Sequence, residues 1–120
     1  MSNIKNADCG FNPDDFGHFS IVEASALKSA DGFDLAVHRN MRVDLSKESA
    51  DLQIADFNNM VSGAHYTLVA VNGAATQNQV KFPANTTLYS EDITAAAGMT
   101  IVYNFFTDGY SIYCERAVYE

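Results

Sequence analysis

The stretch Met99-Thr100-Ile101-Val102-Tyr103-Asn104-Phe105-Phe106-Thr107-Asp108-Gly109-Tyr110-Ser111-Ile112-Tyr113-Cys114 decides the fold of this 120-residue chain. Its first half is rich in β-branched and aromatic residues, which are enriched in strands. Asp108-Gly109 then supplies the backbone conformations that tight hairpin turns require, and a second apolar run follows. We therefore predict a C-terminal β-hairpin that closes the domain.

Shorter runs of the same kind lie upstream of this hairpin. Residues 33–37 and 41–45 alternate apolar with polar side chains, the period of two expected of a strand with one wet face. Residues 66–71 form a β-branched and aromatic run that ends at Asn72-Gly73, where we expect a loop longer than two residues. Residues 80–82 form a short strand that ends at a proline.

These short strands, separated by turns and with little helix, favour an all-β fold. The predicted architecture is an antiparallel β-sandwich or a jelly-roll-like fold. Residues 20–30 stay open between helix and strand, because their apolar positions satisfy both periods in part. Residues 46–57 also stay open, since the alternation around Leu52 and Ile54 favours a strand modestly while the segment is rich in good helix formers. Residues 91–98 are expected to form a loop, since the segment is short for a stable helix.

The composition indicates one packed domain. A hydrophobic fraction of 48%, with 8 Phe and 6 Tyr, exceeds that of a disordered chain. Residues 1–18 are polar and show no sustained period, so we predict an extended N-terminal arm followed by a single β-domain over residues 19–120. Phe11, Phe16 and Phe19 are unusual in a solvated segment. They either cap the domain's own core or pack on a neighbouring subunit.

Charge and hydropathy exclude several classes of partner. The 15 acidic and 7 basic residues give a formal charge of -8, which repels phosphate backbones, so nucleic acid is not expected as a partner. No stretch approaches the length of a membrane helix, and the first residues have no apolar signal-peptide core. We therefore expect no membrane partner, synthesis in a cytoplasm, and Cys9 and Cys114 as thiols rather than a disulfide.

The sequence contains no recognisable catalytic, cofactor or metal motif. His18, His38 and His65 have no helical pairing and no carboxylate at a known metal spacing. Asp14-Asp15 beside His18 is the best metal-like cluster, and we interpret it as a solvated acidic loop. Ser62-Gly63 lacks the glycine-flanked turn of a serine hydrolase. We expect no cofactor and no enzymatic activity.

Three stretches together carry a resemblance to a known family. They are Gly63-Ala64-His65-Tyr66-Thr67-Leu68-Val69-Ala70-Val71, Val80-Lys81-Phe82-Pro83, and Gly98 through the Asp108-Gly109 turn to Tyr110. This pattern resembles a recurring β-domain of tailed-bacteriophage virion proteins, found in head fibres, tail fibres and capsid decoration proteins. The resemblance covers residues 33–114 and implies a small β-sandwich, commonly trimeric, that binds rather than catalyses.

The leading hypothesis is a structural virion protein of the capsid-decoration or head-fibre type, made in a bacterial host cytoplasm and assembled into the virion. Its partners would be copies of itself, with a homotrimer favoured, and the major capsid protein or another virion protein. The candidate contact residues are Phe11, Phe16, Phe19, Tyr103, Phe105, Tyr110 and Tyr113. The alternative is a carbohydrate-binding tail-fibre module whose Tyr110 or Tyr113 stacks on a host glycan. A small hydrolase is the third hypothesis.

Overall fold

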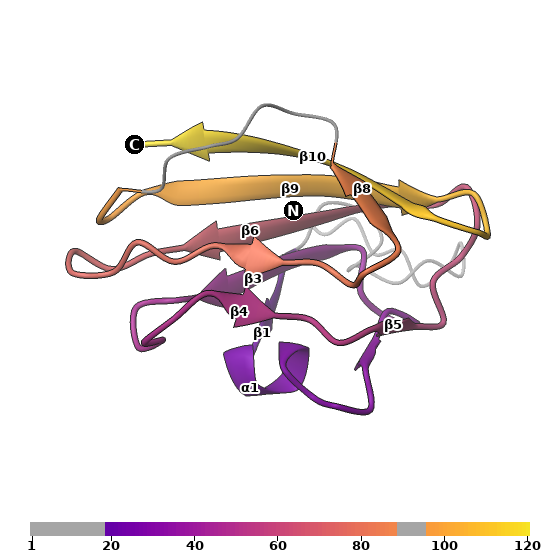
Figure 1. The fold of residues 1–120 in the computed structure, drawn as a ribbon, viewed down its shortest axis with the longest axis horizontal. Coiled ribbons are helices and arrows are strands. Elements are labelled where there is room, and N and C mark those ends of the chain that lie inside the picture. Colours follow the sequence, from indigo (N-terminus) through magenta and orange to yellow (C-terminus); the bar gives the residue numbers. More distant parts are fainter. Residues whose placement is uncertain (1–18, 89–95) are drawn as a thin grey trace, which may run out of the picture.

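The fold is mostly β in the computed structural model, which describes residues 19–88 and 96–120 (Figure 1). The predicted arm, residues 1–18, and most of the predicted loop at 91–98 lie outside the described residues. The elements are β1 (Ser20–Val22), α1 (Ala24–Leu27), β2 (Phe33–Asp34), β3 (Asn40–Asp44), β4 (Leu52–Gln53), β5 (Phe57–Asn58), β6 (His65–Val71), β7 (Val80–Lys81), β8 (Thr86–Leu88), β9 (Thr100–Thr107) and β10 (Ile112–Tyr119).

Six strands form one mixed sheet in the order β1-β3-β6-β9-β10-β8. Among the strands of the described residues, only β6–β9 and β9–β10 are antiparallel, whereas β1–β3, β3–β6 and β8–β10 are parallel. Two further pairs, β2–β5 and β4–β7, are also parallel. The prediction of an antiparallel fold is therefore wrong for most pairings. Residues 23–39 and 45–64 are long enough to act as the crossovers that parallel neighbours need.

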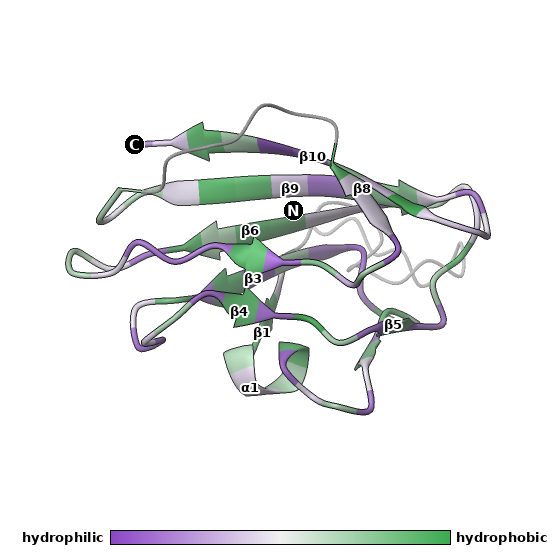
Figure 2. Cartoon of the chain, in the orientation of Figure 1, coloured by the Kyte–Doolittle hydropathy of each residue, from purple (hydrophilic) through white to green (hydrophobic). Residues whose placement is uncertain are grey.

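One face of the large sheet forms the core. Ile101, Tyr103 and Phe105 alternate along β9 and point into it, and each is at most 1% exposed. Tyr66 and Leu68 of β6 lie beside them in the antiparallel register. Figure 2 shows the matching bands of hydrophobic residues on β6, β9 and β10. The period of two seen in the sequence therefore sorts these side chains into an inner and an outer set.

A second layer, made of α1 and the two small sheets, covers this core face (Figure 1). Its buried side chains are Leu27, Phe33, Leu35, Leu52, Ile54, Phe57 and Val80. The Phe105 ring lies 5.2 Å from that of Phe57, 5.5 Å from that of Tyr66 and 5.0 Å from that of Phe82, measured between centroids. An aromatic cluster thus joins the two layers.

The two segments that the sequence left undecided between helix and strand differ in the structure. Residues 20–30 contain both structures, strand β1 and then the single helical turn α1. Residues 46–57 contain no helix, and their regular structure is β4 and the start of β5. The predicted strand over 33–37 is wrong after Asp34, because the Asp34 carboxylate accepts a hydrogen bond from the backbone N–H of Ala36 and turns the chain.

The predicted C-terminal hairpin is confirmed. β9 and β10 pair in register from Thr100 opposite Tyr119 to Thr107 opposite Ile112. The connecting loop, residues 108–111, contains Gly109 at a φ of +96°, a conformation that L side chains adopt only with strain. The Thr107 hydroxyl closes the loop by donating a 2.7 Å hydrogen bond to the Ser111 carbonyl.

A hydrogen bond inside the core yields a first prediction. The backbone N–H of Val80 donates to the phenolic oxygen of Tyr103 at 2.9 Å, and both residues are buried. Tyr103→Phe keeps the ring and leaves this amide without its acceptor, so we expect the free energy of unfolding to fall by about 1–3 kcal/mol. Urea denaturation followed by circular dichroism measures it. Tyr119→Phe, at a ring that is 59% exposed, is the control and should change nothing; equal stability of both variants would contradict the buried bond.

Candidate functional site

The second face of the large sheet is left uncovered by the described elements, because α1 and the small sheets all lie on the core side (Figure 1). We call this surface the open face. All of its residues are at least partly exposed, and about half are apolar or aromatic. They are Ile21, Asn40, Arg42, Asp44, His65, Thr67, Val69, Val71, Thr87, Thr100, Val102, Asn104, Phe106, Tyr113, Glu115, Ala117 and Tyr119.

The open face is almost neutral although the chain is acidic. Arg42 is its one cation and Asp44 and Glu115 are its anions, so with His65 neutral its formal charge is -1, against -8 for the whole chain. Neither of the two ion pairs found among the described residues involves Arg42. Like-charge repulsion is therefore weak here, and an acidic partner, including another copy, can approach this face.

An aromatic row crosses the open face at its hairpin end. The sheet register places His65 beside Phe106 and Phe106 beside Tyr113. The ring centroids of His65 and Phe106 are 5.1 Å apart, and those of Phe106 and Tyr113 are 5.4 Å apart in a stacked arrangement. Aromatic residues with apolar faces and polar tips are enriched at protein interfaces. The row therefore has the composition of a contact surface.

Asp108 fixes the end of this row. Its carboxylate accepts hydrogen bonds from the backbone N–H groups of Ser111 and Tyr110, both at 2.9 Å, and from the Tyr113 hydroxyl at 3.1 Å. These donors lower the pKa of Asp108, with the Ser111 amide as the largest cause, and the same contact raises the pKa of Tyr113. The Tyr113 ring is thereby held at a defined place beside Phe106.

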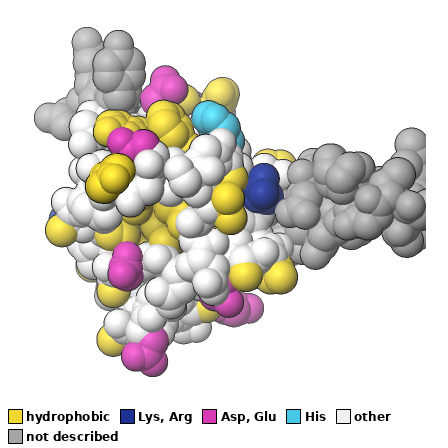
Figure 3. Space-filling view, turned by 90° about the vertical axis from the view of Figure 1, so that its right-hand side faces the viewer, with side chains coloured by type: hydrophobic (Ala, Val, Ile, Leu, Met, Phe, Trp, Pro, Cys, Tyr) yellow, Lys and Arg dark blue, Asp and Glu magenta, His cyan; other side chains and the backbone are white. Residues whose placement is uncertain are grey.

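The hairpin loop also presents a single exposed ring. Tyr110 is 88% exposed and lies beside a recess of about 260 Å³. The recess is lined by Asp56, Phe57, Asn59, Met60, Asn85, Thr107, Gly109, Tyr110 and Ile112. Figure 3 views this end of the molecule and shows hydrophobic side chains gathered beside acidic ones and a histidine. A flat ring next to carboxylate and amide groups can stack on an apolar ligand face and bond to hydroxyls.

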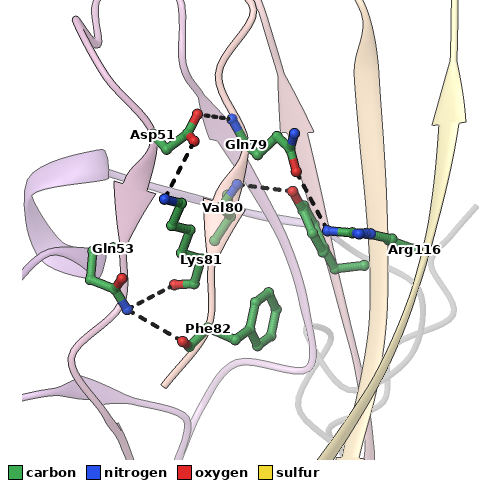
Figure 4. A network of polar contacts seen from close by, with 8 residues as sticks. Asp51, Gln53, Gln79, Val80, Lys81, Phe82 and Arg116 are labelled. Atoms are coloured by element: carbon green, nitrogen blue, oxygen red, sulfur yellow. Dashed lines mark hydrogen bonds and ion pairs between the residues drawn. The ribbon is translucent and has the colours of Figure 1, made fainter. Parts of the chain in front are cut away.

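A second recess, of about 290 Å³, lies between β7 and β8 and is bordered by a polar network (Figure 4). Asp51 accepts a 2.8 Å hydrogen bond from the Gln79 backbone N–H and lies 3.8 Å from the Lys81 ammonium group. Arg116 donates to the Gln79 side chain at 3.4 Å. The Gln53 amide donates to the backbone carbonyls of Lys81 and Phe82. These contacts join β4, β7 and β10, so the network serves the fold.

The described residues hold no metal-binding cluster. No group of three or more His, Cys, Asp or Glu is arranged to hold a metal ion among them. His38 stacks on Phe33 at 5.4 Å, far from the aromatic row in the sequence and on the other layer. Cys114 is free and buried, and desolvation raises its pKa to about 12, so the thiol is not ionised at neutral pH. The cluster Asp14-Asp15 with His18, like Cys9, lies outside the described residues.

The structure separates the predicted contact residues into three groups. Tyr110 and Tyr113 lie at the hairpin end, and Phe19, which is 48% exposed, precedes β1. Tyr103 and Phe105 are 0% and 1% exposed, so these two pack inside the core and offer no surface for a partner. Phe11 and Phe16 lie outside the described residues.

Sequence reasoning missed two members of the aromatic row, His65 and Phe106. The signal for Phe106 was present, because residues on a strand alternate between faces and its neighbour Phe105 points inward. The signal for His65 was absent, since its place depends on pairing with a strand about 40 residues away. The pairing register of β6 with β9, rather than the local sequence pattern, places His65 beside Phe106.

Comparison with known proteins does not assign the chain to a family. No family model, no curated protein and no solved structure matches the chain. Within the described residues no helix has the length and apolar character needed to cross a membrane, as α1 has only four residues.

The Asp108 contacts yield a second prediction. Because its pKa is lowered in the folded protein, Asp108 stabilises the hairpin at pH values above the ordinary aspartate pKa of about 3.9. This contribution to stability disappears as the pH falls through the lowered pKa. Tyr113→Phe removes one donor, so the pKa of Asp108 should rise while remaining below the ordinary value, since both backbone donors persist. A carboxyl-carbon NMR titration measures it. Tyr119→Phe is the control; an unchanged Asp108 titration in Tyr113→Phe would mean that the hydroxyl does not bind the carboxylate in solution.

Proposed function

We propose that this chain is a structural protein of a tailed-bacteriophage virion, of the capsid-decoration or head-fibre type. It binds copies of itself, with a homotrimer as the favoured assembly, and the major capsid protein or another virion protein. It catalyses no reaction. Its domain is a β-sandwich in which the large sheet forms one layer and the two small sheets with α1 form the other. The resemblance carried by residues 63–71, 80–83 and 98–110 supports this assignment.

The observation that carries the proposal is the open face. Monomeric proteins rarely expose large contiguous apolar patches, and larger ones mark interaction sites. Here Val69, Val102 and Ala117 lie side by side across β6, β9 and β10, and one polar row, made of Thr67, Asn104 and Glu115, separates them from the aromatic row. A sheet face of this composition is stabilised when a partner covers it, since each Å² of apolar surface removed from water contributes about 25 cal/mol. The near-neutral charge of the face permits that contact.

Self-association is the third prediction. The purified chain should be oligomeric at micromolar concentration, and Phe106→Ser should weaken association about tenfold, because aromatic residues dominate interface energies. Val37→Ser is the matched control, since Val37 is 53% exposed but lies in the loop between β2 and β3. Sedimentation velocity measures the oligomer, and circular dichroism confirms that each variant is folded. A chain that stays monomeric, or a Val37→Ser variant that is weakened equally, would contradict a role for the open face.

Location in the virion needs a separate experiment. Phage particles produced by the genome that encodes the chain are purified on a density gradient and probed with an antibody against it. We expect the chain to co-sediment with intact particles, and immunogold labelling to place it on the head. Absence from purified particles overturns the proposal, and labelling confined to tail fibres would move the protein to the second candidate function.

That second candidate is a carbohydrate-binding tail-fibre module, which is favoured by one specific observation. Tyr110 projects into solvent beside a recess that contains Asp56, Asn59 and Asn85. The recess volume of about 260 Å³ lies below that of drug-sized pockets, so it suits one sugar ring. Hydroxyl groups would bond to the carboxylate and amides while the ring stacks on the sugar.

Glycan binding is therefore the fourth prediction. On a broad array of bacterial surface glycans, this candidate function requires that Tyr110→Ala lose binding that the wild-type chain shows. Tyr119→Ala is the control, because Tyr119 is also exposed but lies at the opposite end of β10. No binding by the wild-type chain, or equal binding by both variants, rejects the candidate.

A further inference from the structure

We propose that the open face binds residues 1–18 of a neighbouring copy of the chain. The inference rests on the proposed function, because it requires an oligomer, and it names the occupant of the surface described above. Residues 1–18 contain Ile4, Phe11 and Phe16 among mostly polar residues. Isolated Phe side chains in a polar segment match a partner surface that is half apolar.

The area of the open face favours an added segment over simple face-to-face pairing of two copies. Six strands spaced by about 4.8 Å, with the longest of eight residues and both edge strands of three, confine the face to about 24 by 26 Å, or roughly 600 Å² at most. A standard stable interface buries about 800 Å² on each partner. Each Phe ring of a segment laid across the face adds about 150–250 Å² of apolar area. Two such rings, Phe11 and Phe16, would bury about 300–500 Å² of the segment's own apolar surface against the face.

The length of the segment permits the crossing. Eighteen residues in extended conformation span about 60 Å, more than twice the width of the sheet. The segment is continuous with β1, an edge strand, so it starts at the border of the open face. It is therefore long enough to leave its own sheet and lie across the sheet of a neighbour.

Two exposed apolar residues lie where the segment joins the sheet. Ile21 lies on the open face of β1 and is 78% exposed, and Phe19 is 48% exposed. Both side chains are therefore available for contact with a neighbouring copy.

Charge supports the same pairing. Arg42 lies at the middle of β3, next to the edge strand β1, and has no ion pair among the described residues. Asp14 and Asp15 lie next to Phe16 in the segment and provide carboxylates for it. The contact then combines an apolar centre with a charged rim, as specific interfaces do.

Site-specific photo-cross-linking of the full chain tests the inference, and it is the fifth prediction. Phe11 and, separately, Phe16 are replaced by p-benzoylphenylalanine, and labelled and unlabelled subunits are mixed so that mass spectrometry separates links within a chain from links between chains. We expect links between chains, to peptides that contain Val69, Val102 or Ala117. Ala117→Asp should lower their yield about tenfold, because it places an unpaired charge in the contact. Ala36→Asp, at an exposed alanine off the open face, is the matched control.

The outcomes separate this inference from the proposed function. Links confined to one chain, links to α1 or the small sheets, or no links at all in a sample that sedimentation shows to be oligomeric overturn the inference and leave the virion proposal standing. A monomeric sample overturns both. Equal loss of links in Ala117→Asp and Ala36→Asp also overturns the inference, since the open face would then have no specific part in it.

Discussion

The packing of Phe105 is the interaction on which the rest of the structure depends. Its ring contacts Phe57, Tyr66 and Phe82, which come from three separate segments of the chain. The small sheets have strands of two residues each, and such short pairs are not stable alone. Their position on the large sheet therefore comes from this aromatic cluster and from the bond between Val80 and Tyr103. Because Phe105 points inward, Phe106 must point outward, so the core also orients the open face.

Local patterns in the sequence predicted the strongest strands and the hairpin, and the structure agrees. Residues 99–114 and 66–71 combine β-branched and aromatic composition with turn residues, and both signals are local. The parallel pairings could not be predicted in this way, because alternation assigns a residue to a face and says nothing of the neighbouring strand. The strand expected over 33–37 failed for another local reason, since the Asp34 side chain competes with the ladder for the backbone N–H of Ala36.

The candidate surface was predictable only in part. The sequence placed an excess of aromatic residues on the hairpin, and Tyr110 and Tyr113 do lie at its exposed end. It did not assign the aromatic residues of β9 to faces, so Tyr103 and Phe105 were grouped with surface residues although both are core. The burial of one residue of β9 fixes the direction of all the others. The contribution of His65 needed the register between β6 and β9, which arises from long-range packing.

Both edges of the large sheet, as the structure describes it, are formed by strands of only three residues, β1 and β8. A long, flat edge with unpaired backbone groups is a template on which further chains add strands and grow into fibrils. Three residues offer few such groups to an incoming chain, although β8 covers only the first three residues of the eight-residue β10. Where the short strands form the edge, contact between copies is directed to side chains on the half-apolar face and away from edge-to-edge strand pairing.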